Sequence, residues 1–217
     1  MADAARAHHD PVTTEFRTHH PKGLWILFFT EAWERFSYYG MRALLTLFMV
    51  EQLLYNDERS YGVYAAYTSL VYLFPLVGGY MADKYLGYRK AIVLGGTLMA
   101  AGQFCLAFGP FYWGLALLCV GNGFFKPNIS STVGKLYADG DPMRDRGFTI
   151  FYMGINLGAF LAPLACGWIA SQFGRQYGFS LAGAGMILGL LNFLRGQKML
   201  EGAGLPPEYY ERYKNDL

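Results

Sequence analysis

The stretch FFTEAWERFSYYGMRALLTLFMV, residues 28–50, places Glu31, Glu34, Arg35 and Arg42 inside an otherwise apolar segment. The segment is long enough to cross a lipid bilayer as a helix. At about 100° per residue, Glu31, Arg35 and Arg42 fall within roughly 60° of one another on one face. A charge at membrane depth costs several kcal/mol and is tolerated mainly at a cavity or beside a partner charge. This helix is therefore the first candidate for a functional site.

The rest of the chain has the composition of a membrane protein. Of its 217 residues, 53% are hydrophobic and 16% are charged, which is atypical of a water-soluble domain. Six apolar runs are long enough to span the hydrocarbon core as helices, at residues 24–54, 61–81, 91–108, 113–133, 148–169 and 177–194. The sequence thus predicts an all-α polytopic membrane protein with a bundle of six transmembrane helices. Glycines in GAGMILG and LGGTLMAAG indicate close helix packing.

Charge distribution gives an expected domain organisation and orientation. We expect a polar cytoplasmic tail at 1–23, the helix bundle at 24–194 and a second cytoplasmic segment at 195–217. Most of the 18 Lys and Arg residues lie in these two segments and in the second-to-third and fourth-to-fifth loops. The positive-inside rule then places both termini in the cytoplasm. The net charge of +2 is explained by these loops, so we expect no nucleic-acid partner.

A third intramembrane cation stands in the fourth run. Lys126 precedes Pro127, which removes one helical hydrogen bond. If Arg35, Arg42 and Lys126 face one cavity, that cavity suits a carboxylate, a phosphate or a nitrate. Glu31 and Glu34 would offset the charge in the empty site, and a proton on either would free Arg35 for an anionic ligand. This arrangement predicts the coupling of proton and substrate binding, although a purely structural Glu31–Arg35 pair at i, i+4 is the alternative for that pair.

Aromatic residues extend the candidate site, and other kinds of site find little support. Tyr38, Tyr39 and Tyr72 can each offer a ring and a hydroxyl to a polar ligand. No nucleophile stands beside a base, no phosphate-binding glycine loop occurs and no metal-ligand spacing recurs. We therefore expect neither an enzyme nor a metal or cofactor, with protons as the coupling ion. The amino-terminal arm, residues 1–23, contains the paired histidines His8, His9, His19 and His20. These histidines fit a polar tail better than a metal site.

Four stretches together resemble a known family. EAWERFSYYG, residues 31–40, is similar to the ExxERFxYYG signature of the proton-coupled oligopeptide transporters, a branch of the major facilitator superfamily. GGYMADKYLGYRK at 78–90 resembles the superfamily's second-to-third loop motif. GNGFFKPN at 121–128 and FYMGINLGAFLAP at 151–163 resemble the family's fourth- and fifth-helix motifs. The resemblance covers residues 24–194.

The resemblance implies roles for particular residues. It implies proton coupling by Glu31, Glu34 and Arg35. It implies that the substrate's carboxylate end is held by Arg35, Arg42 and Lys126, in a site lined by Tyr38, Tyr39, Tyr72 and Asn156. It further implies a conformational latch that contains Gly79, Asp83 and Arg89.

The resemblance also implies an incomplete transporter. Family members are about twice this length and have two six-helix halves around a midplane site. We therefore expect this chain to be the amino-terminal bundle of a symporter of protons with di- and tripeptides in the cell membrane, working with a carboxyl-terminal six-helix half. One alternative is proton-coupled transport of nitrate or another small anion. The other is a non-transporting membrane protein with an interaction or regulatory role, against which the intact charged face argues.

Overall fold

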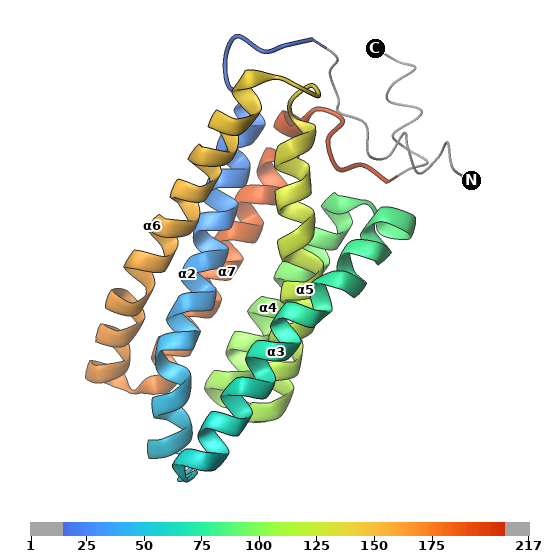
Figure 1. Ribbon diagram of the computed structural model, residues 1–217. Coiled ribbons are helices and arrows are strands. Elements are labelled where there is room, and N and C mark those ends of the chain that lie inside the picture. The colour runs from blue at the N-terminus through green and yellow to red at the C-terminus, as the bar shows by residue number, and fades with distance from the viewer. Residues whose placement is uncertain (1–14, 207–217) are drawn as a thin grey trace.

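The computed structural model describes residues 15–206, and within this range it contains six long α-helices and no strand (Figure 1). The helices are α2 (Lys22–Glu51), α3 (Asp57–Met81), α4 (Tyr88–Phe108), α5 (Phe111–Lys135), α6 (Pro142–Phe173) and α7 (Arg175–Gly196). Two short helices, the π-helix η1 (Ala82–Leu86) and the 3₁₀-helix η2 (Gln197–Leu200), directly follow α3 and α7. The all-α, six-helix prediction is confirmed.

Two helices begin at polar caps outside the apolar runs. Asn56 accepts a hydrogen bond from the backbone N–H of Arg59 at 2.9 Å and so starts α3. Asp141 accepts one from the N–H of Met143 at 2.8 Å, and Pro142 occupies the first helical position of α6. The helix α6 therefore begins six residues before the apolar run that predicted it, because a capped polar turn precedes the apolar part.

The helices pack as two groups of three. In one group α2 packs against α6 and α7, and in the other α5 packs against α3 and α4. The groups meet mainly where α4 packs against α7. In Figure 1 the blue α2 lies beside the orange α6, and the teal α3, the green α4 and the yellow-green α5 form the other group. Because α2 and α5 touch at few points, polar side chains can meet between them.

Glycines allow the closest helix contacts. A Cβ atom on Gly78 of α3 would lie 2.8 Å from the backbone nitrogen of Phe124 in α5 and still closer to the carbonyl of Gly123. A Cβ on Gly95 of α4 would lie 2.5 Å from the carbonyl oxygen of Gly121. Only a residue without a side chain fits at such distances. The predicted packing role of the glycine-rich segments is borne out at Gly95.

Four helical segments are long and apolar enough to cross a membrane, namely Asp57–Leu86, Tyr88–Phe108, Pro142–Phe173 and Arg175–Leu200. Large apolar side chains are exposed on them, as Trp168 and Leu164 of α6 illustrate. Helices α2 and α5 are not among these four: α2 carries the four ionisable residues, and α5 carries the polar sequence GNGFFKPN. The chain is a membrane protein, and the two long helices outside this set of four carry the candidate site.

The end of the arm that the structure describes is bonded to the bundle. Arg17 donates from Nε to the carbonyl oxygen of Leu136 at 2.7 Å and from Nη2 to Glu201 at 2.8 Å. The Nδ1 atom of His20 lies 2.9 Å from the hydroxyl of Tyr137. Burial raises the pKa of Tyr137 to about 12. Residues 15–21 are therefore part of the packed structure and not a free polar tail.

The metal alternative concerns four histidines of the arm. His8 and His9 lie outside the described residues. His19 lies 3.0 Å from the hydroxyl of Thr18, and His20 contacts Tyr137. Within residues 15–206, no three His, Cys, Asp or Glu side chains are grouped as metal ligands would be.

Candidate functional site

The first feature of the candidate site is a buried ion pair within α2. Arg35 donates from Nη2 to Glu34 Oε1 at 2.6 Å and from Nε to Glu34 Oε2. The Glu34 side chain is fully buried, and that of Arg35 is 8% exposed. Two parallel hydrogen bonds of this kind fix the guanidinium in one orientation. The helical wheel places Glu34 at the edge of the charged face, and the long Arg35 side chain reaches it there.

Glu31 forms the second feature, a carboxylate shared by two cations. Its Oε1 accepts a hydrogen bond from Lys126 Nζ at 2.6 Å and lies 3.5 Å from Arg35 Nε. Its other oxygen, Oε2, is buried and has no hydrogen-bond partner among the described residues. A buried oxygen without a partner is costly in free energy unless a donor or a proton is supplied. Glu31 thus combines two ion-pair contacts with one unsatisfied acceptor.

Helix α5 carries Lys126 to this carboxylate without breaking. The helix is continuous through Pro127. The side chain of Asn128, one residue later, donates to the carbonyl oxygen of Phe124 at 2.6 Å and lies 3.5 Å from that of Gly78. The polar residues of GNGFFKPN thus satisfy backbone groups where α5 crosses α3, so Lys126 projects from a rigid segment.

Two tyrosines of the ExxERFxYYG-like stretch surround the Arg35 guanidinium. The Cζ atom of Arg35 lies 4.8 Å from the ring centre of Tyr38 and 6.0 Å from that of Tyr39. The two rings meet edge to face with their centres 5.2 Å apart. Cation–π contacts of this kind stabilise a guanidinium that is shielded from water. The predicted neighbourhood of Arg35, Tyr38 and Tyr39 is therefore present in the structure.

Arg42 lies apart from this cluster, further along α2. It is exposed, and its Nε donates to the hydroxyl of Tyr64 on α3 at 2.5 Å. Its guanidinium also lies 5.7 Å from the centre of the Tyr64 ring. Tyr64 has no place among the residues selected from the sequence. Tyr64 can be recognised as a partner of Arg42 only when the packing of α3 beside α2 is known, and no local motif predicts that packing.

The last two predicted lining residues are exposed. Tyr72 on α3 is 74% exposed, and it lies within electrostatic range of Tyr38. Asn156 on α6 is exposed and forms no hydrogen bond with another described residue. The structure therefore brings Glu31, Glu34, Arg35, Tyr38, Tyr39 and Lys126 together. Arg42 and Tyr72 lie at the margin of that cluster, and no contact joins Asn156 to it.

The predicted latch residues lie at the carboxyl-terminal end of α3 and in the elements η1 and α4 that follow it. Asp83 is half-buried in η1 and hydrogen-bonds the hydroxyl of Tyr88. Arg89 donates from Nε to the carbonyl oxygen of Ala203 at 2.7 Å and from Nη2 to that of Glu201 at 2.5 Å. Gly79 is not required sterically, because a Cβ there would lie 3.8 Å from Pro127. Arg89 thus binds the segment that follows α7.

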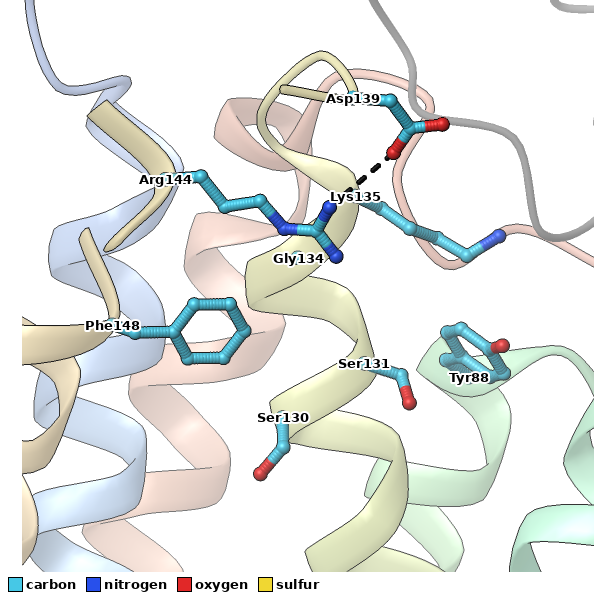
Figure 2. A pocket seen from close by; sticks show the side chains of 8 residues that line it. All are labelled: Tyr88, Ser130, Ser131, Gly134, Lys135, Asp139, Arg144 and Phe148. Carbon is cyan, nitrogen blue, oxygen red and sulfur yellow. Dashed lines mark hydrogen bonds and ion pairs between the residues drawn. The ribbon is translucent and has the colours of Figure 1, made fainter. Parts of the chain in front are cut away.

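An open cavity of about 370 Å³ lies near the carboxyl-terminal end of α5 (Figure 2). Ser130 lines it one helical turn beyond Lys126, and Arg144 and Phe148 of α6 close its other side. Arg144 pairs with Asp139 at 3.3 Å, as the dashed line in Figure 2 marks. The cavity therefore adjoins the charged cluster along α5 without containing it.

Comparisons with known proteins identify a family and relatives for this chain. Residues 89–212 match the POT family (PTR2). The chain is 42% identical over 199 residues to the uncharacterized transporter YclF of Bacillus subtilis, covering 86% of this chain and 40% of that protein. It is 39% identical over 194 residues to the dipeptide and tripeptide permease A of Proteus mirabilis, covering 87% and 40%. These relatives are transporters, not enzymes.

Solved structures of POT family transporters are also similar to this chain. A crystal structure of the peptide transporter POT in complex with sulfate aligns with a TM-score of 0.82 at 41% identity, covering 95% of this chain and 45% of that one. A POT family transporter in complex with 5-aminolevulinic acid aligns with a TM-score of 0.82 at 34% identity, covering 97% and 46%. The chain thus spans less than half the length of these relatives. The comparisons lend no support to the nitrate or the non-transporting alternative.

Proposed function

The chain belongs to the POT family, and from that premise we propose that it forms the amino-terminal bundle of a symporter that carries di- and tripeptides together with protons. The observation that carries the proposal is the Glu31 carboxylate, which contacts Lys126 at 2.6 Å and Arg35 at 3.5 Å. The carboxyl end of a peptide is also a carboxylate, so it can bind Lys126 and Arg35 as Glu31 does. The named relatives, a dipeptide and tripeptide permease among them, support this substrate class.

A competition between two carboxylates provides the coupling. In the empty site, Glu31 and Glu34 neutralise Lys126 and Arg35. A proton bound by Glu31 removes its charge and so weakens its hold on Lys126 and Arg35. Lys126 and one edge of Arg35 then bind the substrate carboxylate instead. Because Glu34 holds the same guanidinium, a change at either glutamate alters the hold on Arg35.

The remaining predicted residues complete the proposed site. Tyr38, Tyr39, Tyr72 and Asn156 line it, and Arg42 offers a further cation at its margin. A relative solved with sulfate and another solved with 5-aminolevulinic acid, which carries a carboxylate, are consistent with recognition of an anionic group. Gly79, Asp83 and Arg89 act as a latch at the end of the bundle, where Asp83 and Arg89 have polar partners.

We also propose the orientation and the partner of this bundle. The end at which α2 begins faces the cytoplasm of a cell membrane, because the basic loops gather there. A carboxyl-terminal six-helix half, on the same or a separate chain, completes the transporter, and 195–217 forms the start of the link. The coverage of 40% of the named permease supports this division.

Dialanine uptake tests the proposal. The chain is reconstituted in liposomes, alone and with a matching carboxyl-terminal half, with and without an inward acid gradient. Gradient-driven uptake that needs the second half is the expected result, and E31Q should abolish the dependence on the gradient. Uptake of nitrate but not of dialanine, or dialanine uptake insensitive to the gradient, would overturn the proposal.

A further inference from the structure

Two cavities that lie away from the candidate transport site share the lining residue Met199. The first, about 600 Å³, lies between residues 16–22 of the arm and η2, and it is lined by Lys22 and Lys198. The second, about 280 Å³, follows the seam between α2 and α7, and it is lined by Ile26 and Trp33. Met199 lines both. The first, called the polar cavity here because Lys22 and Lys198 line it, thus shares Met199 with a second cavity whose lining is mostly apolar.

The seam lies on the opposite side of α2 from the candidate transport site. At about 100° per residue, Ile26 and Trp33 lie at least about 140° from Glu31 around the helix. On α7, Leu188 and Leu191 line the same seam and are 47% and 40% exposed. Exposed apolar side chains on this face of a membrane protein are suited to acyl chains.

The polar cavity and the adjoining end of the seam carry cations that the bundle leaves unneutralised. Lys22, Arg195 and Lys198 form no ion pair with another residue of the range 15–206. The carboxylate of this region, Glu201, is paired with Arg17 at 2.8 Å. A single anionic group near Lys22, Arg195 and Lys198 would therefore meet an excess of positive charge.

The dimensions of the seam match one leaflet of a bilayer. Lys22 and Trp33 are separated by eleven residues of α2, or about 16 Å of helix. Half of a hydrocarbon core of about 30 Å is nearly the same length. The apolar segment Arg175–Leu200 ends next to Met199, so the polar cavity lies at the membrane boundary.

We propose that these two cavities bind one anionic phospholipid, with its phosphodiester near Lys22, Arg195 and Lys198 and one acyl chain along the seam between α2 and α7. The site is separate from the transport site and does not depend on the proposed function. A headgroup held there would also contact the arm, which is bonded to the end of the bundle through Arg17 and His20.

Native mass spectrometry of the purified chain in detergent tests the proposal. Dioleoyl phosphatidylglycerol is titrated against dioleoyl phosphatidylcholine, which has the same chains and no net charge. We expect the anionic lipid to bind at least tenfold more tightly. Each cation near an anionic headgroup contributes about fivefold in affinity. The variant R195Q/K198Q should therefore lose most of the preference.

A matched control removes one lysine and one arginine at the same end of the bundle but outside the cavities. Lys84 and Arg146 are exposed there, and K84Q/R146Q should keep the preference for the anionic lipid. Equal binding of the two lipids by the unmodified chain, or equal losses in both variants, would overturn the proposal. Displacement of the lipid by inorganic phosphate at comparable concentration would also overturn it, because it would indicate a site for free anions. If R195Q/K198Q does not fold, the two-lipid and phosphate comparisons on the unmodified chain decide alone.

Discussion

Lys126 of α5 and Glu31 of α2 are 95 positions apart in the sequence, yet the Lys126 ammonium donates to the Glu31 carboxylate at 2.6 Å. This ion pair joins the two helix groups at a level where α2 and α5 otherwise touch little. The Glu31 side chain is fully buried, whereas that of Lys126 is 31% exposed. The lysine is therefore the partner that can exchange one carboxylate for another.

The first prediction concerns this pair. K126M leaves Glu31 buried with Arg35 as its remaining cation, and we expect a loss of about 1 to 3 kcal/mol in the free energy of unfolding, together with loss of dialanine uptake. The double variant E31Q/K126M should recover part of the stability, because the buried carboxylate that lost its closest cation is then neutral, but it should not recover uptake. Thermal unfolding in detergent and the uptake assay measure the two effects. A double variant less stable than K126M would contradict the expectation.

The second prediction concerns Arg42 and Tyr64. Y64F removes the 2.5 Å hydrogen bond but keeps the ring beneath the guanidinium. We expect dialanine uptake to show kcat/KM about fivefold lower, which is the equivalent of one hydrogen bond of about 1 kcal/mol. Tyr61, an exposed residue of the same helix, provides the control variant Y61F. If Y61F and Y64F behave alike, Tyr64 does not position Arg42.

The crossing of α3 and α5 gives a third prediction, on stability. G78A would force a methyl group against the Gly123 carbonyl and the Phe124 nitrogen, so we expect a loss of about 2 kcal/mol in the free energy of unfolding. Gly62 lies in the same helix, and a Cβ there meets no atom within 4 Å. G62A should therefore leave the stability unchanged or raise it slightly. Both variants are compared by thermal unfolding in the same detergent.

The fourth prediction concerns alkaline pH. Burial raises the pKa of Tyr137 to about 12, above the ordinary value near 10, so the folded state favours the neutral phenol. Its contribution to stability is complete below pH 10 and is lost as the pH rises from about 10 through 12, because the unfolded chain releases its proton first. Unfolding followed across this range should show a smaller decline for Y137F. At pH 7, Y137F should cost about 1 kcal/mol through the lost contact with His20.

The sequence predicts the helices well because each apolar run must cross the same hydrocarbon thickness. The ends are less accurate. The run predicted at 148–169 lies inside α6 (Pro142–Phe173), since the polar first turn capped by Asp141 carries no apolar signal. Helical periodicity likewise places Glu31 and Arg35 on one face, and the cost of isolated charges makes a partner such as Lys126 necessary.

Tertiary packing explains what the sequence does not show. Tyr64 is one of 17 tyrosines, and only the position of α3 beside α2 selects it. The Glu34–Arg35 pair depends on how one long side chain bends at the edge of the charged face. The bonds of Arg17 and His20 require loops from distant parts of the chain. The functional roles of all the candidate site residues stay predictions, and Tyr72 and Asn156 are in addition exposed.

The hold of Arg89 on the segment after α7 has a mechanical consequence. Its side chain bonds the carbonyl oxygens of Ala203 and Glu201, and its backbone N–H bonds that of Gly204 at 2.9 Å. Gly87 packs so closely that a Cβ there would lie 2.7 Å from the Cα of Pro206. A force or a torque applied to the chain after this segment would therefore be transmitted directly to the start of α4. The bundle would then move as one rigid body with that segment.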